Sequence, residues 1–445
     1  MADSVADAVV RGGTLVSEGL PRADIAIEDG RIAAIGPHLP GAPEEIDARG
    51  LHVFPGLIDI HVHFNEPGRT EWEGAATGSR ALAAGGGTLF FDMPLNSTPC
   101  TVSPAAFDQK RAALAESSIT DFALWGGLIP GAIPHMAEMA ERGVVGFKAF
   151  LCDSGLPEFP RADDLTLFEG LREAARLGLP VAVHAESQEL TAGLAQRLTG
   201  NNVRDFLASR PVVAELEAIQ RATLFARAAG AKLHIVHVSS GRGVALAAEA
   251  RARGVDVSIE TCPHYLFFTE DDVERLGAVA KCAPPLREAT EQDALWAHVL
   301  RRSVHVIASD HSPAPPEMKT GDFSRAWGGI AGVQSTLAVL IDHGYHCRQL
   351  PLEQIAALLS ATPARRFAIA SKGALSVGAD ADLALVDISR SAELQPHRLK
   401  QRHPLSPYLG HSLRGCVERT IRRGETIFLA GEITAQTKGR LVRPS

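Results

Sequence analysis

The sequence has 445 residues, of which 45% are hydrophobic and 22% charged, with a formal net charge of −8. No block of like charge occurs, so neither a nucleic acid nor an anionic membrane is indicated as a partner. The first residues are acidic and no apolar run approaches the roughly 18 residues of a membrane span, so we expect a cytoplasmic protein. The six cysteines lie far apart, which argues against a structural zinc motif or a disulfide scaffold.

Short β-like segments occur at both ends of the chain. Residues 1–51 alternate apolar and polar positions around a turn at 28–30, and residues 371–445 show the same pattern around glycine turns. Each region is too small to bury a core alone. We therefore expect the two regions to form one small β-sandwich domain together.

Residues 52–370 alternate between apolar runs and helical segments. The strand candidates span 52–64, 86–94, 121–129, 144–151, 180–186, 232–239, 255–265 and 304–312, and helical segments include 77–84, 164–177, 213–229 and 243–253. This pattern predicts an α/β fold, a (β/α)8 barrel of the TIM type, whose catalytic residues lie at the C-terminal ends of the strands. An open doubly wound sheet is the alternative, but it lacks the expected glycine-rich phosphate turn.

Metal-capable side chains occur late in these predicted strands. His61 and His63 are two residues apart, so they point to the same face of a strand and can share one metal ion. Two structural histidines on a polar strand face are the alternative for this motif by itself. Further candidates at predicted strand ends are Lys148, His184, His237 and Asp310.

Two of these positions leave a choice. An unpaired lysine such as Lys148 is unfavourable in an apolar wall, so either Asp92 or Asp310 pairs with it or its amine has reacted with CO2. The resulting carbamate would bridge two cations, and the surrounding histidines favour it. His234 competes with His237, since residues three apart face opposite sides, and His237 is nearer the strand's C-terminal end.

Several blocks resemble the cyclic amidohydrolases of the amidohydrolase superfamily, most closely the allantoinase branch. They include PGLIDIHVHFNEPGRTEWEG, GGGTLFFDMPLNSTP, GFKAFL, VHAE, HIVHVSS, ETCPHYL, KCAPPLR, SDHSPAPPEMK, AWGGIAGVQS and RHPLSPYLG, within a likeness from near residue 8 to near residue 440. The resemblance implies a barrel with a small sandwich from both termini, a binuclear metal centre, and a homotetramer or homodimer.

The resemblance also implies a ligand set. His61, His63 and Asp310 would hold one ion, His184 and His237 the other, and carboxylated Lys148 would bridge them. All these positions are filled, which argues against a non-catalytic scaffold. Zinc is the first expectation, and Co, Mn, Fe or Ni are alternatives. Two such ions would bring a shared water toward ionisation at neutral pH, and Asp310 would pass its proton to the leaving nitrogen of a cyclic amide.

The choice of substrate depends on a few side chains. Dihydroorotases carry an arginine two residues after the HxH motif, where this chain has Asn65, which suits a neutral ureide better than an anionic ring. Asn96 can bond a ureido group, although turn formation beside Pro94 and Pro99 explains it equally well.

Further pocket candidates are His264, Cys282 and Trp327, the last two through the backbone of their loops. His264 can instead cap a loop, and His311 should point away from the face that Asp310 uses. The expected reaction is the opening of allantoin to allantoate in purine-ureide breakdown. Hydantoin or dihydropyrimidine hydrolysis is the second expectation, and dihydroorotate hydrolysis the third.

Overall fold

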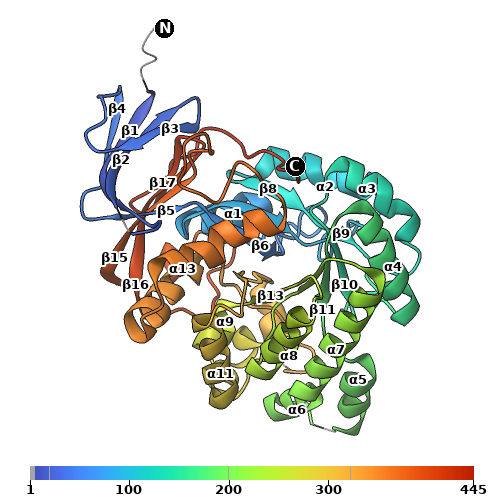
Figure 1. Cartoon of the computed structure of the whole chain (residues 1–445). Helices are drawn as coiled ribbons and strands as arrows, with labels where there is room; N and C mark the ends of the chain where they lie inside the picture. Colours follow the sequence, from blue (N-terminus) through green and yellow to red (C-terminus); the bar gives the residue numbers. More distant parts are fainter. Residues whose placement is uncertain (1–5, 20, 199, 321) are drawn as a thin grey trace.

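The computed structural model describes residues 6–19, 21–198, 200–320 and 322–445. Figure 1 shows a barrel surrounded by helices, with a β-rich domain beside it in which blue N-terminal and red C-terminal strands lie together. Within these ranges, no helix is both long enough and apolar enough to cross a membrane.

The β-rich domain is one nine-stranded sheet with the order β18-β17-β16-β15-β5-β1-β2-β3, and β4 pairs with β1. Its strands are β1 (Ala8–Leu15), β2 (Arg22–Glu28), β3 (Arg31–Gly36), β4 (Glu44–Asp47), β5 (His52–Pro55), β15 (Leu383–Glu393), β16 (Ser412–Arg422), β17 (Glu425–Leu429) and β18 (Glu432–Ile433). Because β5 pairs with both β1 and β15, it joins the two ends of the chain. The prediction of a β-rich domain built from both termini is confirmed.

This sheet folds over a shared apolar core. Ile25 and Ile27 of β2 belong to the same buried cluster as Leu383 and Leu385 of β15. The two halves also bond directly, since the backbone N–H of Ala381 donates to the carbonyl of Gly30 at 2.8 Å. Neither end of the chain has enough apolar surface to bury such a core alone, which explains why they fold together.

The barrel consists of parallel strands in the order β6-β7-β8 and β9-β10-β11-β12-β13-β14. They are β6 (Leu57–Val62), β7 (Gly87–Asp92), β8 (Asp121–Leu124), β9 (Gly126–Gly127), β10 (Phe147–Phe150), β11 (Val181–His184), β12 (Leu233–Ile235), β13 (Val257–Thr261) and β14 (Val306–Ile307). The ring closes where the N–H of His63 donates to the carbonyl of His311 at 2.8 Å. The predicted (β/α)8 barrel is confirmed, with β8 and β9 together in the place of one strand.

Two predicted strands have wrong bounds. The strand in 255–265 ends at Thr261, and a helix begins at Pro263. The segment 52–64 is two strands, β5 in the nine-stranded sheet and β6 in the barrel, separated by Gly56. A Cβ at Gly56 would lie 2.4 Å from the hydroxyl of Thr88, so only glycine fits where the chain crosses between the sheets. The apolar run continues through this crossing, so the sequence pattern does not indicate that one strand ends and another begins there.

Helices surround the barrel. They are α1 (Ala75–Ala84), α2 (Pro104–Ser117), α3 (Met136–Arg142), α4 (Asp164–Leu177), α5 (Gln188–Arg197), α6 (Val203–Ser209), α7 (Val212–Ala229), α8 (Gly241–Ala252), α9 (Pro263–Phe267), α10 (Glu270–Leu276), α11 (Ala289–Leu300), α12 (Thr336–Val339), α13 (Leu352–Ala356) and α14 (Thr362–Arg366). Short 3-10 turns occur at Ile133–His135, Gly277–Ala280, Pro316–Lys319, Val333–Ser335 and Pro396–Arg398, and π-helical turns at Leu340–His346 and Ala357–Ala361. The segment 164–177 was predicted correctly, because Asp163 caps its first turn and Gly178 ends it in the left-handed region.

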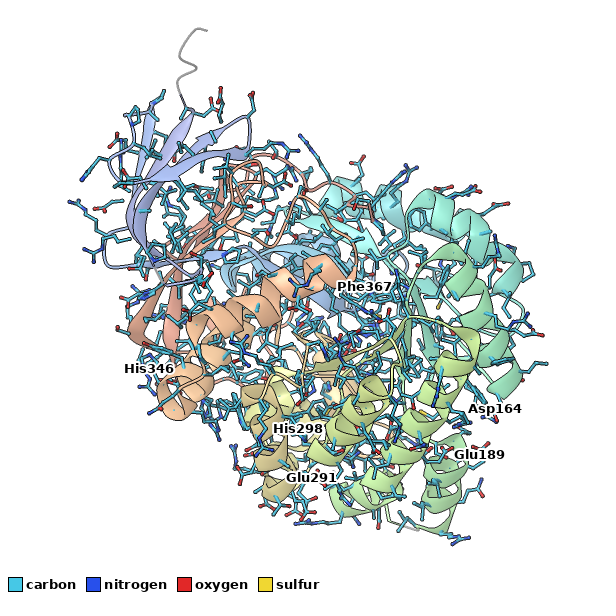
Figure 2. The ribbon with its side chains drawn as sticks, viewed as in Figure 1. Asp164, Glu189, Glu291, His298, His346 and Phe367 are labelled. Atoms are coloured by element: carbon cyan, nitrogen blue, oxygen red, sulfur yellow. The ribbon has the colours of Figure 1, made fainter. Side chains whose placement is uncertain are left out.

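The barrel interior is filled by side chains. The ring of Phe367 contacts Trp125 and Phe91, with centroids 5.2 and 5.3 Å apart. Figure 2 shows Phe367 near the centre of the molecule, whereas Asp164 and Glu189 lie on the outer helices. The interior is therefore a packed core, and the barrel is accessible to a ligand at the C-terminal ends of its strands.

Candidate active site

The predicted ligands meet at one end of the barrel. His61 lies on β6, Lys148 on β10 and His184 at the end of β11, while His237 and Asp310 follow β12 and β14. These strands run parallel, so their C-terminal ends share one edge. A cavity of about 690 Å³ opens there, and its wall includes His61, His63, His184, His237 and Asp310.

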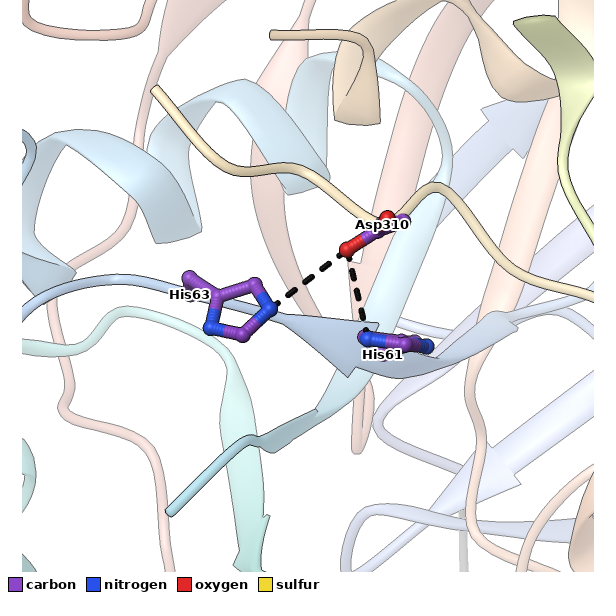
Figure 3. Close-up of side chains that lie close together, drawn as sticks. All are labelled: His61, His63 and Asp310. Atoms are coloured by element: carbon purple, nitrogen blue, oxygen red, sulfur yellow. Dashed lines mark ion pairs between the residues drawn. The ribbon is translucent and has the colours of Figure 1, made fainter. Parts of the chain in front are cut away.

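His61, His63 and Asp310 converge on one point (Figure 3). Oδ1 of Asp310 lies 3.2 Å from Nε2 of His61 and 3.4 Å from Nε2 of His63. Both histidines point from the same face of the chain, as their spacing requires. Two imidazole nitrogens and a carboxylate oxygen this close together form a donor set suited to a divalent ion.

His184 and His237 form a second pair beside the first group. Their ring centroids are 4.6 Å apart, and the ring of His237 lies 5.4 Å from that of His61. The Nδ1 atoms of His184 and His237 are buried and have no hydrogen-bond partner among the described residues. Burial lowers the pKa of both rings below the ordinary histidine value, and the neutral form is the one that binds metals.

Lys148 lies on β10, beside the strand β11 that ends in His184. Its side chain is fully buried, and Nζ has no hydrogen-bond partner in the described part of the chain. Asp92, one acid considered as its partner, pairs instead with Lys110. Burial lowers the pKa of Lys148 to about 8, so a larger fraction of its amine is neutral than for an exposed lysine.

Glu260 on β13 contacts three of the histidines and was not among the predicted site residues. Its Oε1 lies 2.8 Å from Nδ1 of His61 and accepts the backbone N–H of His237 at 3.0 Å. Its Oε2 lies 3.0 Å from Nε2 of His234, whose other nitrogen contacts Ser258. His234 is therefore occupied beneath the site, whereas His237 faces the cavity. An acidic residue within the apolar run of a predicted strand is the feature of the sequence that could have indicated a site role for Glu260.

Glu186 has a similar place beside His184. Its Oε2 lies 2.8 Å from Nε2 of His184 and also pairs with the guanidinium of Arg210. Burial raises the pKa of Glu186, but the charge of Arg210 and the bond to His184 outweigh it and lower the pKa to about 2. A carboxylate on the outer nitrogen of a ligand histidine fixes the ring and increases its basicity.

Three of the predicted substrate contacts line the cavity, namely Asn96, Cys282 and Trp327. Asn96 has a φ of 68°, a left-handed conformation that asparagine adopts more readily than most residues. The turn role and the cavity role of Asn96 are thus compatible. The indole Nε1 of Trp327 is buried without a hydrogen-bond partner among the described residues, so it is free to donate to a ligand.

Asn65, His264 and His311 lie outside that wall. Asn65 is buried with a φ of 61°, and neither polar atom of its amide has a partner within the described ranges. His264 is also buried, with a ring nitrogen within 4.8 Å of a ligand atom of Asp310. His311 accepts the N–H of Gly332 at 3.2 Å and so points away from the cavity, as its position next to Asp310 predicted.

A (β/α)8 barrel whose strand ends bring together histidines, a buried lysine and an aspartate is the architecture of a metal-dependent hydrolase. Residues 52–427 match the model of the Amidohydrolase family, and the chain belongs to that family. The chain is 66% identical to an allantoinase of Solibacter usitatus over 99% of its length and 97% of that protein. It is 59% identical to an allantoinase of Rubrobacter xylanophilus over 99% of its length and 98% of that protein.

Solved structures of related hydrolases share the fold. An L-hydantoinase (dihydropyrimidinase) from Arthrobacter aurescens matches with a TM-score of 0.96 and 34% identity, covering 99% of this chain and 100% of that one. A dihydropyrimidinase from Brevibacillus agri matches with a TM-score of 0.91 and 28% identity, covering 98% of each chain.

Proposed function

We propose that this protein hydrolyses the cyclic amide bond of allantoin to give allantoate. The observation that carries the substrate is the 66% identity to an allantoinase along nearly the whole chain. The convergence of His61, His63 and Asp310 at the mouth of the barrel supports the reaction class. Hydantoin and dihydropyrimidine rings are the alternative, since solved relatives at 34% and 28% identity carry those names.

The donor set fits two divalent ions. His61, His63 and Asp310 would hold one, and His184 with His237 the other, because the free Nδ1 atoms of the second pair are buried at the cavity. Lys148 would bridge the two as a carbamate, which explains a buried nitrogen without a partner among the described residues. Zinc is the expected metal, and Co, Mn, Fe and Ni suit the same ligands. Such ions supply a nucleophile at neutral pH and polarise the amide carbonyl.

Asp310 moves the proton. Its Oδ1 faces the two histidines of β6, and the residue lines the cavity where the ring would lie. A carboxylate in this position accepts the proton of the attacking water and returns it to the ring nitrogen as the amide bond breaks. The leaving nitrogen then becomes the uncharged terminal NH2 of a ureido group in the opened product.

Neutral donors and acceptors in the wall suit a neutral ring. Trp327 offers a free indole N–H, and Asn96 lines the same cavity with an amide. Allantoin presents carbonyl oxygens and N–H groups without a carboxylate, so such groups match it better than an arginine would. Asn65 is buried outside this wall, so the match to a neutral ring rests on Asn96 and Trp327.

The assay that tests the proposal compares allantoin, hydantoin, dihydrouracil and dihydroorotate on one sample of known metal content. We expect a strong preference for allantoin and about two metal ions per chain. Preference for another ring would overturn the proposed substrate and leave the proposed metal site unchanged. A metal-free protein without any ring-opening activity would indicate a scaffold instead.

Light scattering on the same sample tests the expected homotetramer or homodimer, and cell fractionation tests the expected cytoplasmic location.

A further inference from the structure

A loop after β14, residues 322–329, covers part of the cavity. Its residues Ser324 to Gly329 line the wall, so the position of this backbone decides what the cavity accepts. The ammonium of Lys281 holds one end of the loop. Its Nζ donates to the carbonyls of Phe323 at 2.6 Å, Ala326 at 2.8 Å and Ser324 at 3.3 Å.

A second lysine holds the other end. Nζ of Lys319 donates to the carbonyl of Trp327 at 2.9 Å, to that of Ala278 at 3.1 Å and to that of Gly329. The N–H of Gly329 in turn donates to the carbonyl of Lys281 at 2.8 Å. An ammonium has three N–H donors, and here each lysine donates all three to backbone carbonyls. The loop is thereby tied to the segment that carries Cys282 in the same wall.

Aromatic rings complete these attachments. Nζ of Lys281 lies 4.9 Å from the ring of Phe206 on α6 and 5.0 Å from that of Phe323, within the range of cation–π attraction. The two rings meet edge to face at 5.6 Å. On the other side, Trp327 packs against Trp72 with centroids 4.8 Å apart. The loop is therefore fastened both to α6 and to the loop that follows β6.

We propose that Lys281 and Lys319 are positioning residues that hold loop 322–329 against the bound ring. Burying an ammonium group costs free energy. Two buried ammonium groups that both bond the backbone of this loop therefore indicate that the position of this backbone matters for function. They act on the substrate through Trp327 and the backbone of Gly328 and Gly329. The identity of the ring rests on the proposed function, whereas the fastening of the loop does not.

The test replaces each lysine by methionine, which keeps the unbranched side chain as far as Cε and removes the ammonium donors. In Lys281→Met and Lys319→Met we expect KM for allantoin to rise about tenfold or more, with kcat within about threefold and metal content unchanged. Arg325 is exposed in the loop, so trypsin should cleave after it faster in both variants than in the wild type. The matched control is Lys232→Met, since Lys232 is exposed and also donates to a backbone carbonyl, that of Gly178.

Wild-type KM together with wild-type cleavage at Arg325 would overturn the proposal, as would loss of kcat and metal with KM unchanged. If the methionine variants do not fold, Phe206→Leu and Lys281→Arg decide, because the first leaves both lysines in place and the second keeps a charged donor beneath the loop. Raised KM and faster cleavage in both support the proposal, and wild-type values in both contradict it. A wild-type protein inactive on allantoin would refute the proposed function, while the cleavage rates would still test the fastening of the loop.

Discussion

Nδ1 of His61 on β6 lies 2.8 Å from Oε1 of Glu260 on β13, so one barrel strand fixes the imidazole of another. The bond directs Nε2 of the ring toward Asp310, which lies 3.2 Å away. Because Glu260 also bonds His234 and the backbone of His237, it fixes both sides of the candidate metal centre at once. The geometry of the centre therefore depends on a residue that does not line the cavity.

Glu260→Gln should weaken metal binding about 10- to 100-fold, the usual cost of losing a carboxylate behind a ligand histidine. The amide keeps the shape of the side chain, so the fold should persist. Competition with a chelator measures the affinity, and circular dichroism checks the fold. Glu249→Gln on the exposed face of α8 is the control. Unchanged affinity in Glu260→Gln would show that His61 is held in place by other contacts.

Lys148→Ala should lose nearly all activity, because it removes the amine that would carry the proposed bridging carbamate. Short carboxylic acids such as acetate or propionate should restore part of it by supplying the missing carboxylate. Hydrolysis is measured with and without the acid, and Lys232→Ala serves as the control. Full activity without added acid would exclude a bridging role for Lys148.

Lys372 joins the two domains by pairing with three buried carboxylates. Its Nζ lies 2.9 Å from Asp121 on β8, 3.0 Å from Asp380 and 2.6 Å from Asp382. Lys372→Met should lower the free energy of unfolding by about 3–5 kcal/mol, since it leaves buried charge without its main partner. Denaturant unfolding at pH 7 measures this, with Lys232→Met as the control. A loss below about 1 kcal/mol would contradict the expected role.

The same variant should also weaken the dependence of stability on pH. Burial raises the pKa of Asp121, but Lys372 and Arg423 outweigh it and hold the pKa below the ordinary value. In the wild type this stabilisation is present above about pH 4 and is lost as the pH falls through the lowered folded pKa. Without Lys372 only Arg423 still lowers the folded pKa of Asp121, so the variant should lose less stability than the wild type as the pH falls toward 4. Parallel wild-type and variant curves would contradict this.

Asn65→Arg should not create dihydroorotase activity. Asn65 has a φ of 61°, which costs an arginine about 1–2 kcal/mol, and the residue does not line the cavity. We expect a lowered melting temperature and no hydrolysis of dihydroorotate, measured by its absorbance. Asn65→Gly, which adopts the same φ freely, separates strain from the loss of the amide. Hydrolysis of dihydroorotate by the arginine variant would make this one position the determinant of ring choice.

The sequence by itself determined the barrel, the β-rich domain and the place of the ligand candidates. Strand alternation has a period of two residues, so His61 and His63 were assigned to one face, and His237 was preferred to His234, from neighbouring residues alone. Eight apolar runs separated by helices were enough for the (β/α)8 fold. These properties depend on residues close together in the chain, so the local sequence pattern predicts them.

Only the tertiary structure decided which side chains meet. Glu260 reaches His61 across 199 positions of the chain, and no spacing rule connects them. Three other features also depend on contacts between distant segments. They are the crossing at Gly56, the attachment of loop 322–329 by Lys281 and the burial of Asn65 away from the cavity wall. Each depends on closure of the barrel against its loops and the nine-stranded sheet, which brings distant segments into contact after the local faces are already set.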